Sequence, residues 1–321
     1  MIPLWVWAFA LQSNVGFVTF TVPDPGHEDI SAAAWYPAIP AGHDTSLGFY
    51  HQVVAVGGMM TPGRHPLVLI SHGTGGWLGT HYDTARELAD AGFVVVAFTH
   101  PHDNSQDPSA TGSRRNLIDR PRQLLRVLDF VIRAWALRDH VDASRVGVFG
   151  HSLGAYTVLV AAGGVPDFAQ LGTLCRVHPM APECAFVRQY QGNRPDTTPP
   201  PSEWPHDSRI KAVVIAAPAL GFVFGDSGLK HVRAPVSLWV ADQDTMAPRE
   251  WNSDVVARSL PSPPEVHAPQ GSNHFSFLAP CTPALARAVP FICMDADGFD
   301  RTAFHEGFDA DVVQFFREHL R

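Results

Sequence analysis

The sequence predicts an α/β fold, with a mostly parallel central sheet and helices on both faces of that sheet. Apolar runs of strand length alternate with amphipathic segments of helix length along most of the 321 residues. Several of these runs are apolar throughout, which is typical of strands buried on both faces. A regular alternation of strands and helices favours a parallel sheet covered on both sides.

The elements follow one another along the chain. Two early strands, at residues 15–22 and 30–36, are expected to form an antiparallel entry to the sheet. Further strands are expected at residues 66–71, 93–100, 146–149, 210–219, 236–244 and 265–268. Helices are expected at residues 80–91, 120–137, 153–162, 250–260 and 309–320, the last with Asp309 as its N-cap.

Residues 163–208 interrupt this alternation. The segment is rich in proline, includes Pro199–Pro201 and contains two cysteines. It is longer than an ordinary connection between a helix and a strand, which favours a functional or covering role. We therefore expect a single domain over residues 1–321, with residues 163–208 as a cap-like insertion.

Charge and hydropathy exclude some classes of partner. The formal net charge is −8, and the first basic residue is Arg64, with no block rich in Lys or Arg. Nucleic acid is not an expected partner, because phosphate binding needs clustered positive charge. The apolar run at residues 2–11 is too short to span a bilayer, so membrane insertion is not expected. It is interpreted as a frayed or truncated N-terminus, with a signal-peptide remnant as the alternative.

The four cysteines form two pairs that are close in the sequence, Cys175 with Cys184 and Cys281 with Cys293. No C-x-x-C spacing occurs, so a zinc site is not expected. Two local disulfides would suit a periplasmic or secreted protein. The alternative is four buried free thiols in a cytoplasmic protein.

Ser152 is the candidate nucleophile. The residues Gly150-His151-Ser152-Leu153-Gly154 have the pattern G-x-S-x-G and lie between an expected strand and an expected helix. That context is the one required for a nucleophile elbow, in which the serine stands on a strained turn and the glycines allow strand and helix to approach. The alternative is a structural Gly/Ser turn.

A serine nucleophile needs a base, and the base needs an orienting acid. In α/β hydrolases these residues follow along the chain in the order serine, acid, histidine. Four histidines lie after a suitable acid: His267, His274, His305 and His319. His274 lies on a Gly-containing loop after the last expected strand, at the edge of the sheet where ligands gather. A surface or capping position is expected for His305, just before the last helix, and a solvent-facing one for His319.

Three aspartates are candidates for the acid. Asp244 is favoured because it lies further along the loop after its strand and can turn towards the base. Asp242 is nearer the strand end and would hold the turn by local hydrogen bonds. Asp226 follows the preceding strand and is the third choice.

The oxyanion hole is predicted at the backbone N–H groups of Thr74 and Leu153. Thr74 lies in a glycine-rich turn, His72–Gly76, directly after a buried strand. A phosphate loop is the alternative interpretation, but no G-x-x-x-x-G-K-[ST] pattern follows. Trp77, after the same turn, and Phe275, beside the base, are candidate substrate-binding residues, although aromatic residues near strand ends are often core.

With these motifs in this order, the chain resembles members of the α/β-hydrolase superfamily. More narrowly, it is similar to bacterial relatives of platelet-activating-factor acetylhydrolase, a group often labelled predicted dienelactone hydrolases. The segments that carry the resemblance include AAAWYPA, LVLISHGTGG, AGFVVVAFTHPHDN, GVFGHSLGAYT, ADQDTMAP and GSNHFSFLAPC. The resemblance implies carboxylester hydrolysis by Ser152, Asp244 and His274. Dienelactone hydrolases themselves have a cysteine in the elbow, so lactone opening does not carry over.

The segment His100–Asn104 departs from that family. Many relatives have a glycine where this chain has His102. His100, His102 and Asp103 lack the H-x-H-x-D-H pattern of two-metal hydrolases, so a metal site is not expected. These residues are expected to hydrogen-bond the loop beside the oxyanion turn.

The sequence therefore predicts a serine carboxylesterase that acts on short-chain esters through an acyl-enzyme, without a cofactor. Lipase or polyesterase, lactonase and amidase activity are alternatives that use the same residues. A non-catalytic binding protein on a hydrolase fold is the alternative from another class. The expected partner is a small-molecule ester, and the oligomeric state is left open.

Overall fold

An 11-stranded sheet forms the frame of the protein in the computed structural model, which describes residues 14–39, 42–191 and 196–321. The strand order is β11-β10-β9-β8-β6-β7-β2-β1-β4-β3, and β5 pairs with β2 at the side. The strands are β1 Val15–Val22, β2 Ile30–Ile39, β3 His43–Leu47, β4 Tyr50–Val56, β5 Met59–Met60, β6 His65–Ser71, β7 Val94–Phe98, β8 Val141–His151, β9 Ile210–Ala216, β10 Val236–Trp239 and β11 Glu265–His267. The apolar run at residues 2–11 lies outside the described residues.

The sheet is parallel from β7 to β11, and β2 joins β7 in the antiparallel sense. β1 pairs antiparallel with β2, as expected for the entry to the sheet. After β6 the chain adds β7 on one side and then crosses to add β8 on the other. Such a point of reversal leaves a crevice at the carboxyl ends of the strands, where ligands bind in open α/β sheets.

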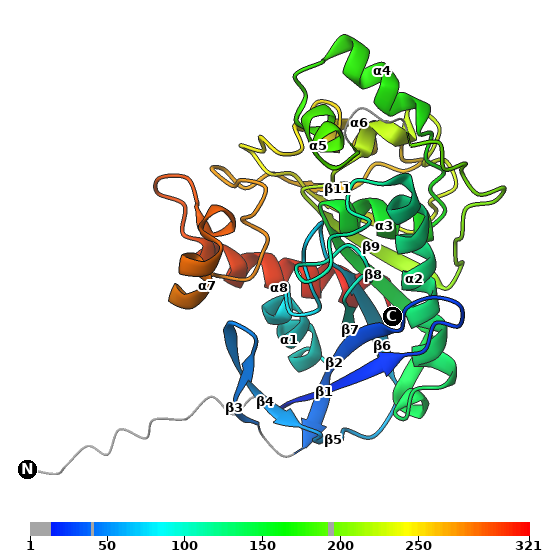
Figure 1. The fold of residues 1–321 in the computed structure, drawn as a ribbon. Coiled ribbons are helices and arrows are strands. Elements are labelled where there is room, and N and C mark those ends of the chain that lie inside the picture. The colour runs from blue at the N-terminus through cyan, green and yellow to red at the C-terminus, as the bar shows by residue number, and fades with distance from the viewer. Residues whose placement is uncertain (1–13, 40–41, 192–195) are drawn as a thin grey trace, which may run out of the picture.

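Helices cover both faces of the sheet (Figure 1). α1 (Tyr82–Asp90) and α8 (Arg301–His319) pack together on one face, while α2 (Arg114–Arg133) and α3 (Leu153–Ala161) pack on the other. Successive side chains of β6 belong to the two different cores, because neighbouring residues of a strand point to opposite faces. The predicted α/β architecture is therefore confirmed.

Two further groups of helices lie away from the middle of the sheet. α4 (Ala169–Val177) and α5 (Pro182–Gln191) belong to the segment of residues 163–208 and lie near α6 (Ser253–Ser259), at the end of the molecule opposite β1 to β5 (Figure 1). α7 (Pro283–Ala288) lies to one side. The 3₁₀ turns are η1 Arg138–His140, η2 Gly221–Phe224 and η3 Pro290–Cys293.

Both predicted disulfides are present. Cys175–Cys184 links α4 to α5, and Cys281–Cys293 closes the loop that contains α7. A periplasmic or secreted location stays a prediction. No helix among the described residues has the length and apolarity needed to cross a membrane.

The last helix begins eight residues earlier than the sequence analysis expected. α8 starts at Arg301, and the side chain of Asp300 accepts a hydrogen bond from the N–H of Ala303. Asp300 is therefore the N-cap, and the expectation that Asp309 caps this helix is wrong. Asp309 lies inside α8 and is buried. The expectation for His305 is also wrong, because this residue is inside α8 and buried as well.

The hairpin of β3 and β4 was not expected. Its strands join through Gly48 and Phe49, and β4 makes only a two-residue parallel contact with β1. α2 is shifted towards the N-terminus from the expected range because Ser113 caps it, accepting a hydrogen bond from the N–H of Asn116 at 3.1 Å.

Candidate active site

Ser152 stands on a sharp turn between β8 and α3. Its backbone has a φ of 54° and a ψ of −119°, a strained conformation for a residue other than glycine. A Cβ added at Gly154 would lie 2.0 Å from the carbonyl oxygen of Ser71, and one added at Gly150 would lie 2.3 Å from the carbonyl oxygen of Gly154. Only glycine fits at these two positions. The G-x-S-x-G pattern therefore corresponds to a close approach of strand and helix.

The structure brings Ser152, His274 and Asp244 together. The Nε2 atom of His274 lies 2.8 Å from the Oγ of Ser152, and its Nδ1 atom lies 2.8 Å from the Oδ2 of Asp244. The carboxylate can only accept, so Nδ1 carries the ring proton and Nε2 is free to accept from the serine hydroxyl. All three side chains are almost fully buried, at 8% exposure or less.

The second oxygen of Asp244 is also occupied. Oδ1 accepts hydrogen bonds from the backbone N–H groups of Met246, at 2.9 Å, and Ala247, at 2.7 Å. These bonds hold the carboxylate in place.

The two other candidate acids lie elsewhere. Asp242 is exposed and accepts a hydrogen bond from the N–H of Gly271 at 3.0 Å, so it links its turn to a distant loop instead of making the expected local hydrogen bonds. Asp226 is exposed and lies 3.9 Å from Arg258. Neither has a recorded contact with His274 in the part of the chain that the structure describes.

The glycine-rich turn after β6 lies directly against Ser152. A Cβ added at Gly73 would be 3.1 Å from the Cβ of Ser152, and the N–H of Gly76 donates to the carbonyl of Gly73 to close the turn. Within the described ranges, the N–H groups of Thr74 and Leu153 make no hydrogen bond. Both predicted oxyanion donors are therefore available for a ligand.

A buried network supports this turn from below. The backbone N–H of His100 donates to Nε2 of His72, so Nδ1 of His72 carries the proton and donates to the carbonyl of Gly73 at 2.6 Å. Burial, followed by the charge of Arg120, lowers the pKa of His72 to about 3, which keeps the ring neutral. Arg120 itself donates to the carbonyl of His72.

Arg120 is fully buried and forms an ion pair with Asp103 at 2.7 Å. It also donates to the Oγ1 of Thr157 in α3, at 3.1 Å. Asp103 accepts two further hydrogen bonds, from Thr111 and Asn116. The pair thus ties α2, α3 and the loop after β7 to the oxyanion turn. Sequence reasoning did not identify Arg120, since nothing in a helix pattern distinguishes one buried arginine from its exposed neighbours.

The expectation for His100–Asn104 is confirmed for two residues. His100 and Asp103 support the oxyanion turn as described above. His102 instead lies half-exposed at the surface, 2.8 Å from Asp107. Its φ of 65° lies in the left-handed region that favours glycine.

Among the residues that the structure describes, two groups of three side chains have the residue types of a metal site. They are Glu28, His102 and Asp107 at the surface, and Asp83, His305 and Asp309 in the interior. In both groups a histidine nitrogen lies within 2.8 Å of a carboxylate oxygen. Between His102 and Asp107 this contact is a hydrogen bond, and between His305 and Asp83 it is an ion pair. Neither group was identified from the sequence.

The two predicted substrate residues differ in their surroundings. Phe275 packs edge-on against the His274 ring, with centroids 5.3 Å apart, and against Phe291 at 5.6 Å. The Trp77 ring lies instead against Gly48 and Gly79, next to the β3–β4 hairpin. Phe275 is therefore beside the base, whereas Trp77 links the oxyanion turn to the hairpin.

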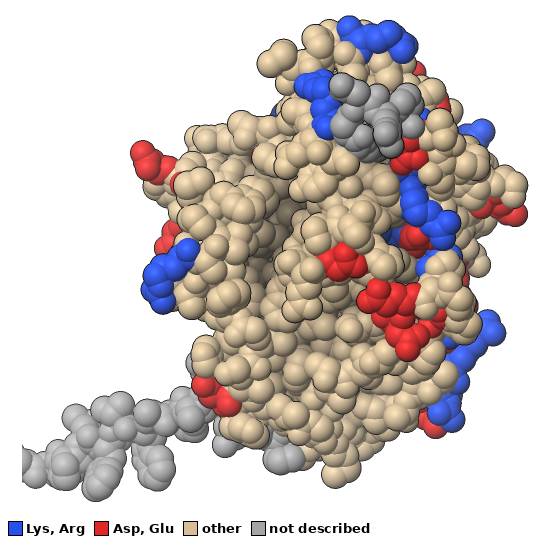
Figure 2. Space-filling view, in the orientation of Figure 1, with Lys and Arg blue, Asp and Glu red and all other residues tan. Residues whose placement is uncertain are grey.

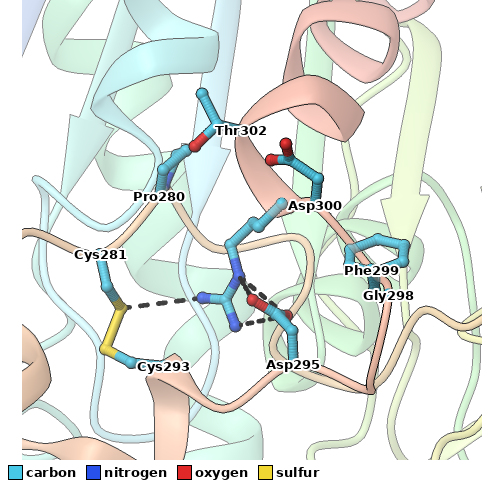
Figure 3. Close-up of a pocket in the computed structure, with 9 residues that line it drawn as sticks. Pro280, Cys281, Cys293, Asp295, Gly298, Phe299, Asp300 and Thr302 are labelled. Carbon is cyan, nitrogen blue, oxygen red and sulfur yellow. Dashed lines mark hydrogen bonds and ion pairs between the residues drawn. A yellow bond between two sulfur atoms is a disulfide. The ribbon is translucent and has the colours of Figure 1, made fainter.

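A polar pocket of about 480 Å³ lies beside the Cys281–Cys293 disulfide and the start of α8 (Figure 3). Arg301 occupies its wall and pairs with Asp295 at 2.8 Å, while also donating to the carbonyl of Ile292. None of Ser152, His274 and Asp244 lines this pocket. On the face shown in Figure 2, Lys and Arg are interspersed with Asp and Glu rather than gathered in one basic patch.

Comparisons with known proteins agree with the resemblance seen in the sequence. Residues 54–191 match the family model described as Dienelactone hydrolase family. No curated protein matches the chain significantly. Among solved structures, the chain is similar to a ferulic acid esterase from Streptomyces cinnamoneus, with a TM-score of 0.65 and 17% identity over 96% of this chain and 90% of that chain. This likeness supports the α/β fold with its mostly parallel sheet. The similarity to platelet-activating-factor acetylhydrolase stays a prediction.

Proposed function

We propose that the chain, a hydrolase of the dienelactone hydrolase kind by its family match, is a serine carboxylesterase that hydrolyses short-chain esters. The observation that carries the proposal is the chain of two hydrogen bonds from Ser152 through His274 to Asp244. Serine alone is a weak nucleophile at neutral pH, and such a chain is what activates it.

The reaction follows from the positions of these groups. His274 Nε2 removes the hydroxyl proton of Ser152 as the oxygen attacks the ester carbonyl. The N–H groups of Thr74 and Leu153 stabilise the oxyanion that forms. His274 then returns the proton to the leaving alcohol, which produces an acyl-enzyme on Ser152. Water attacks this ester with His274 again as the base, and Asp244 supports the imidazolium throughout.

Ser152 in the nucleophile turn favours ester hydrolysis over the hydrolysis of dienelactones, for which the family model is named. Amides, lactones and polyesters remain alternative substrates, since the same groups serve all of them. The solved structure with a similar fold is described as a ferulic acid esterase. A fold shared at 17% identity does not carry a substrate, so a feruloyl ester belongs in the assay as one arm.

We also propose that residues 163–208 act as a cap on the site. Glu183 of α5 is buried and accepts hydrogen bonds from Trp251 at 2.9 Å and Asn252 at 2.7 Å. Trp251 and Asn252 lie on the same connection between β10 and α6 as Asp244. Contact between the segment and that connection supports a covering role. Deletion of residues 169–191 should broaden the range of acyl lengths that are cleaved, and an unchanged range would contradict the proposal.

The test of the proposed function is turnover of p-nitrophenyl esters of increasing acyl length, together with methyl ferulate, by wild type and Ser152→Ala. We expect turnover that is highest for short acyl chains and is lost in the variant. Turnover that survives in Ser152→Ala would contradict the role of Ser152. A preference for amide or lactone substrates in a parallel panel would move the assignment to that alternative.

A further inference from the structure

The loop that follows His274 is held by three buried histidines that take no part in the proposed reaction. Each donates a ring N–H to a different backbone carbonyl of this loop, residues 274–277. A carbonyl can only accept, so the bonding nitrogen of each ring carries a proton. His151 Nε2 lies 2.8 Å from the carbonyl oxygen of His274. His305 Nε2 lies 2.9 Å from the carbonyl oxygen of Ser276, and His81 Nδ1 lies 3.1 Å from that of Phe277.

The three donors come from different parts of the frame. His151 is the last residue of β8, His81 immediately precedes α1, and His305 lies in α8. Each is at most 3% exposed. The loop is therefore fixed to the sheet and to both helices on one face of it. Both nitrogens of the His274 ring make bonds of 2.8 Å, to Asp244 and to Ser152, so a displacement of this loop would alter both.

His151 and His81 are neutral donors. Burial lowers the pKa of His151 to about 3, with the charge of His274 as the next cause. Burial also lowers the pKa of His81 well below its ordinary value. Neither ring changes its charge near neutral pH.

His305 differs from the other two because its second nitrogen faces a carboxylate. Nδ1 lies 2.7 Å from Oδ2 of Asp83, and Nε2 is already used as a donor. Within the described residues, the oxygens of Asp83 and Nδ1 of His305 make no hydrogen bond, so the two side chains are joined as an ion pair. A buried carboxylate without a partner is costly, which favours a doubly protonated His305. Two ligands of one tetrahedral zinc ion would lie about 3.3 Å apart, so the 2.7 Å separation fits an ion pair better than a metal site.

The surroundings of His305 agree with this assignment. Burial alone would lower its pKa, but the charge of Asp83 raises it overall. Burial, followed by the charge of Asp83, raises the pKa of Asp309 to about 8, so this acid is protonated at neutral pH. The other titratable groups next to this cluster are His81, Tyr82 and Glu87 around α1, and Tyr50 from β4.

We propose that His305 is a positioning residue for His274: its imidazolium, held by Asp83, fixes the carbonyl of Ser276 and thereby the place of the His274 ring beside Ser152. Loss of the charge on Asp83 would release His305, since a neutral ring can move its proton to Nδ1 and give up the bond to Ser276. This inference rests on the proposed esterase reaction.

The test compares His305→Leu, His305→Gln and a control on the same helix, His319→Leu, where the side chain is exposed. A displacement of about 1 Å at a reacting group costs roughly 100-fold in rate. We expect kcat for His305→Leu to fall about 10- to 100-fold with KM nearly unchanged. The glutamine amide can reach Ser276 in place of Nε2, so His305→Gln should recover most of the rate, and His319→Leu should match wild type.

Equal losses in His305→Leu and His305→Gln would overturn the proposal, and so would an unchanged kcat in His305→Leu. A readout independent of turnover is the NMR signal of the Nδ1–H proton of His274 in protein labelled with ¹⁵N-histidine. We expect it to shift and broaden in His305→Leu but not in His319→Leu. If wild type hydrolyses no ester, the proposed function fails, and this signal still decides the positioning role.

Asp83→Asn serves if His305→Leu does not fold. It keeps the size of the side chain and removes the charge that holds the second proton on His305. For Asp83→Asn we expect a kcat between those of wild type and His305→Gln, with KM unchanged. In the same NMR experiment the pKa of His305 should be lower than in wild type. A kcat equal to that of wild type would contradict the proposal.

Discussion

Replacement of Arg120 by methionine should destabilise the protein strongly. The guanidinium is fully buried, and its three bonds reach Asp103 in the loop after β7, Thr157 in α3 and the carbonyl of His72 at the oxyanion turn. Methionine fills a similar volume but supplies no charge and no donor. Asp103 would then stay buried with only the neutral donors of Thr111 and Asn116.

The size of the effect follows from this geometry. Removal of one partner of a buried ion pair costs about 3–5 kcal/mol, mostly because the other charge is left without compensation. With a slope of about 3 kcal/mol per M in urea, a loss of about 4 kcal/mol lowers the unfolding midpoint by about 1.3 M. The matched control is Arg133→Met, at the end of the same helix, where the side chain is 74% exposed and lies 3.7 Å from Asp129. An exposed pair of this kind contributes about 0–1 kcal/mol.

The assay is urea unfolding with the disulfides intact, for both variants and for Arg120→Met combined with Asp103→Asn. We expect the double variant to be more stable than Arg120→Met, since asparagine leaves no uncompensated charge in the interior. If Arg120→Met costs no more than Arg133→Met, the buried pair does not stabilise the fold. If the second substitution brings no recovery, the uncompensated charge is not the cause of the loss.

Three further outcomes are expected. Asp244→Asn should lower kcat for p-nitrophenyl esters by about 10⁴-fold, while Asp242→Asn should change it little. Equal losses of kcat in the two variants would contradict a functional role for the hydrogen bond between Asp244 and His274. Gly154→Ala should reduce turnover at least about 100-fold, because its Cβ would lie 2.0 Å from the Ser71 carbonyl and displace the elbow; full activity would show that the turn adapts. Asp309, whose pKa is raised to about 8, holds a proton in the folded protein that the unfolded chain loses near pH 4. Stability should therefore fall as pH rises through that interval, and Asp309→Asn should lose less stability than wild type between about pH 5 and about pH 8 in urea unfolding.

The parts of the site that the sequence predicted are those with strong local patterns. The G-x-S-x-G pattern was informative because a Cβ at Gly150 or Gly154 would clash with the backbone where α3 approaches β8 and β6, so only glycine fits there. The positions of Asp244 and His274 followed from the order of elements, since the carboxyl ends of parallel strands share one edge of the sheet. Asp242 was placed correctly outside the triad, but its bond to Gly271, 29 residues away, was not expected.

The parts that the sequence did not predict depend on contacts between distant residues. Arg120 is one of several arginines on α2, and only the packed structure shows that it is buried. The last helix was placed too late because Asp309 has the residue type of an N-cap. The pattern gave no sign that Asp300 has that role. His305 was consequently placed outside the helix, and its bond to Ser276 could not be seen.

The most direct test of the proposed mechanism is to trap the acyl-enzyme. Wild-type protein is quenched in acid during turnover of a p-nitrophenyl ester, digested and mapped by mass spectrometry. We predict an acyl group on the peptide that contains Ser152, at a level that rises when deacylation is slowed. Turnover without an adduct on that peptide, or an adduct on another residue, would contradict nucleophilic attack by Ser152.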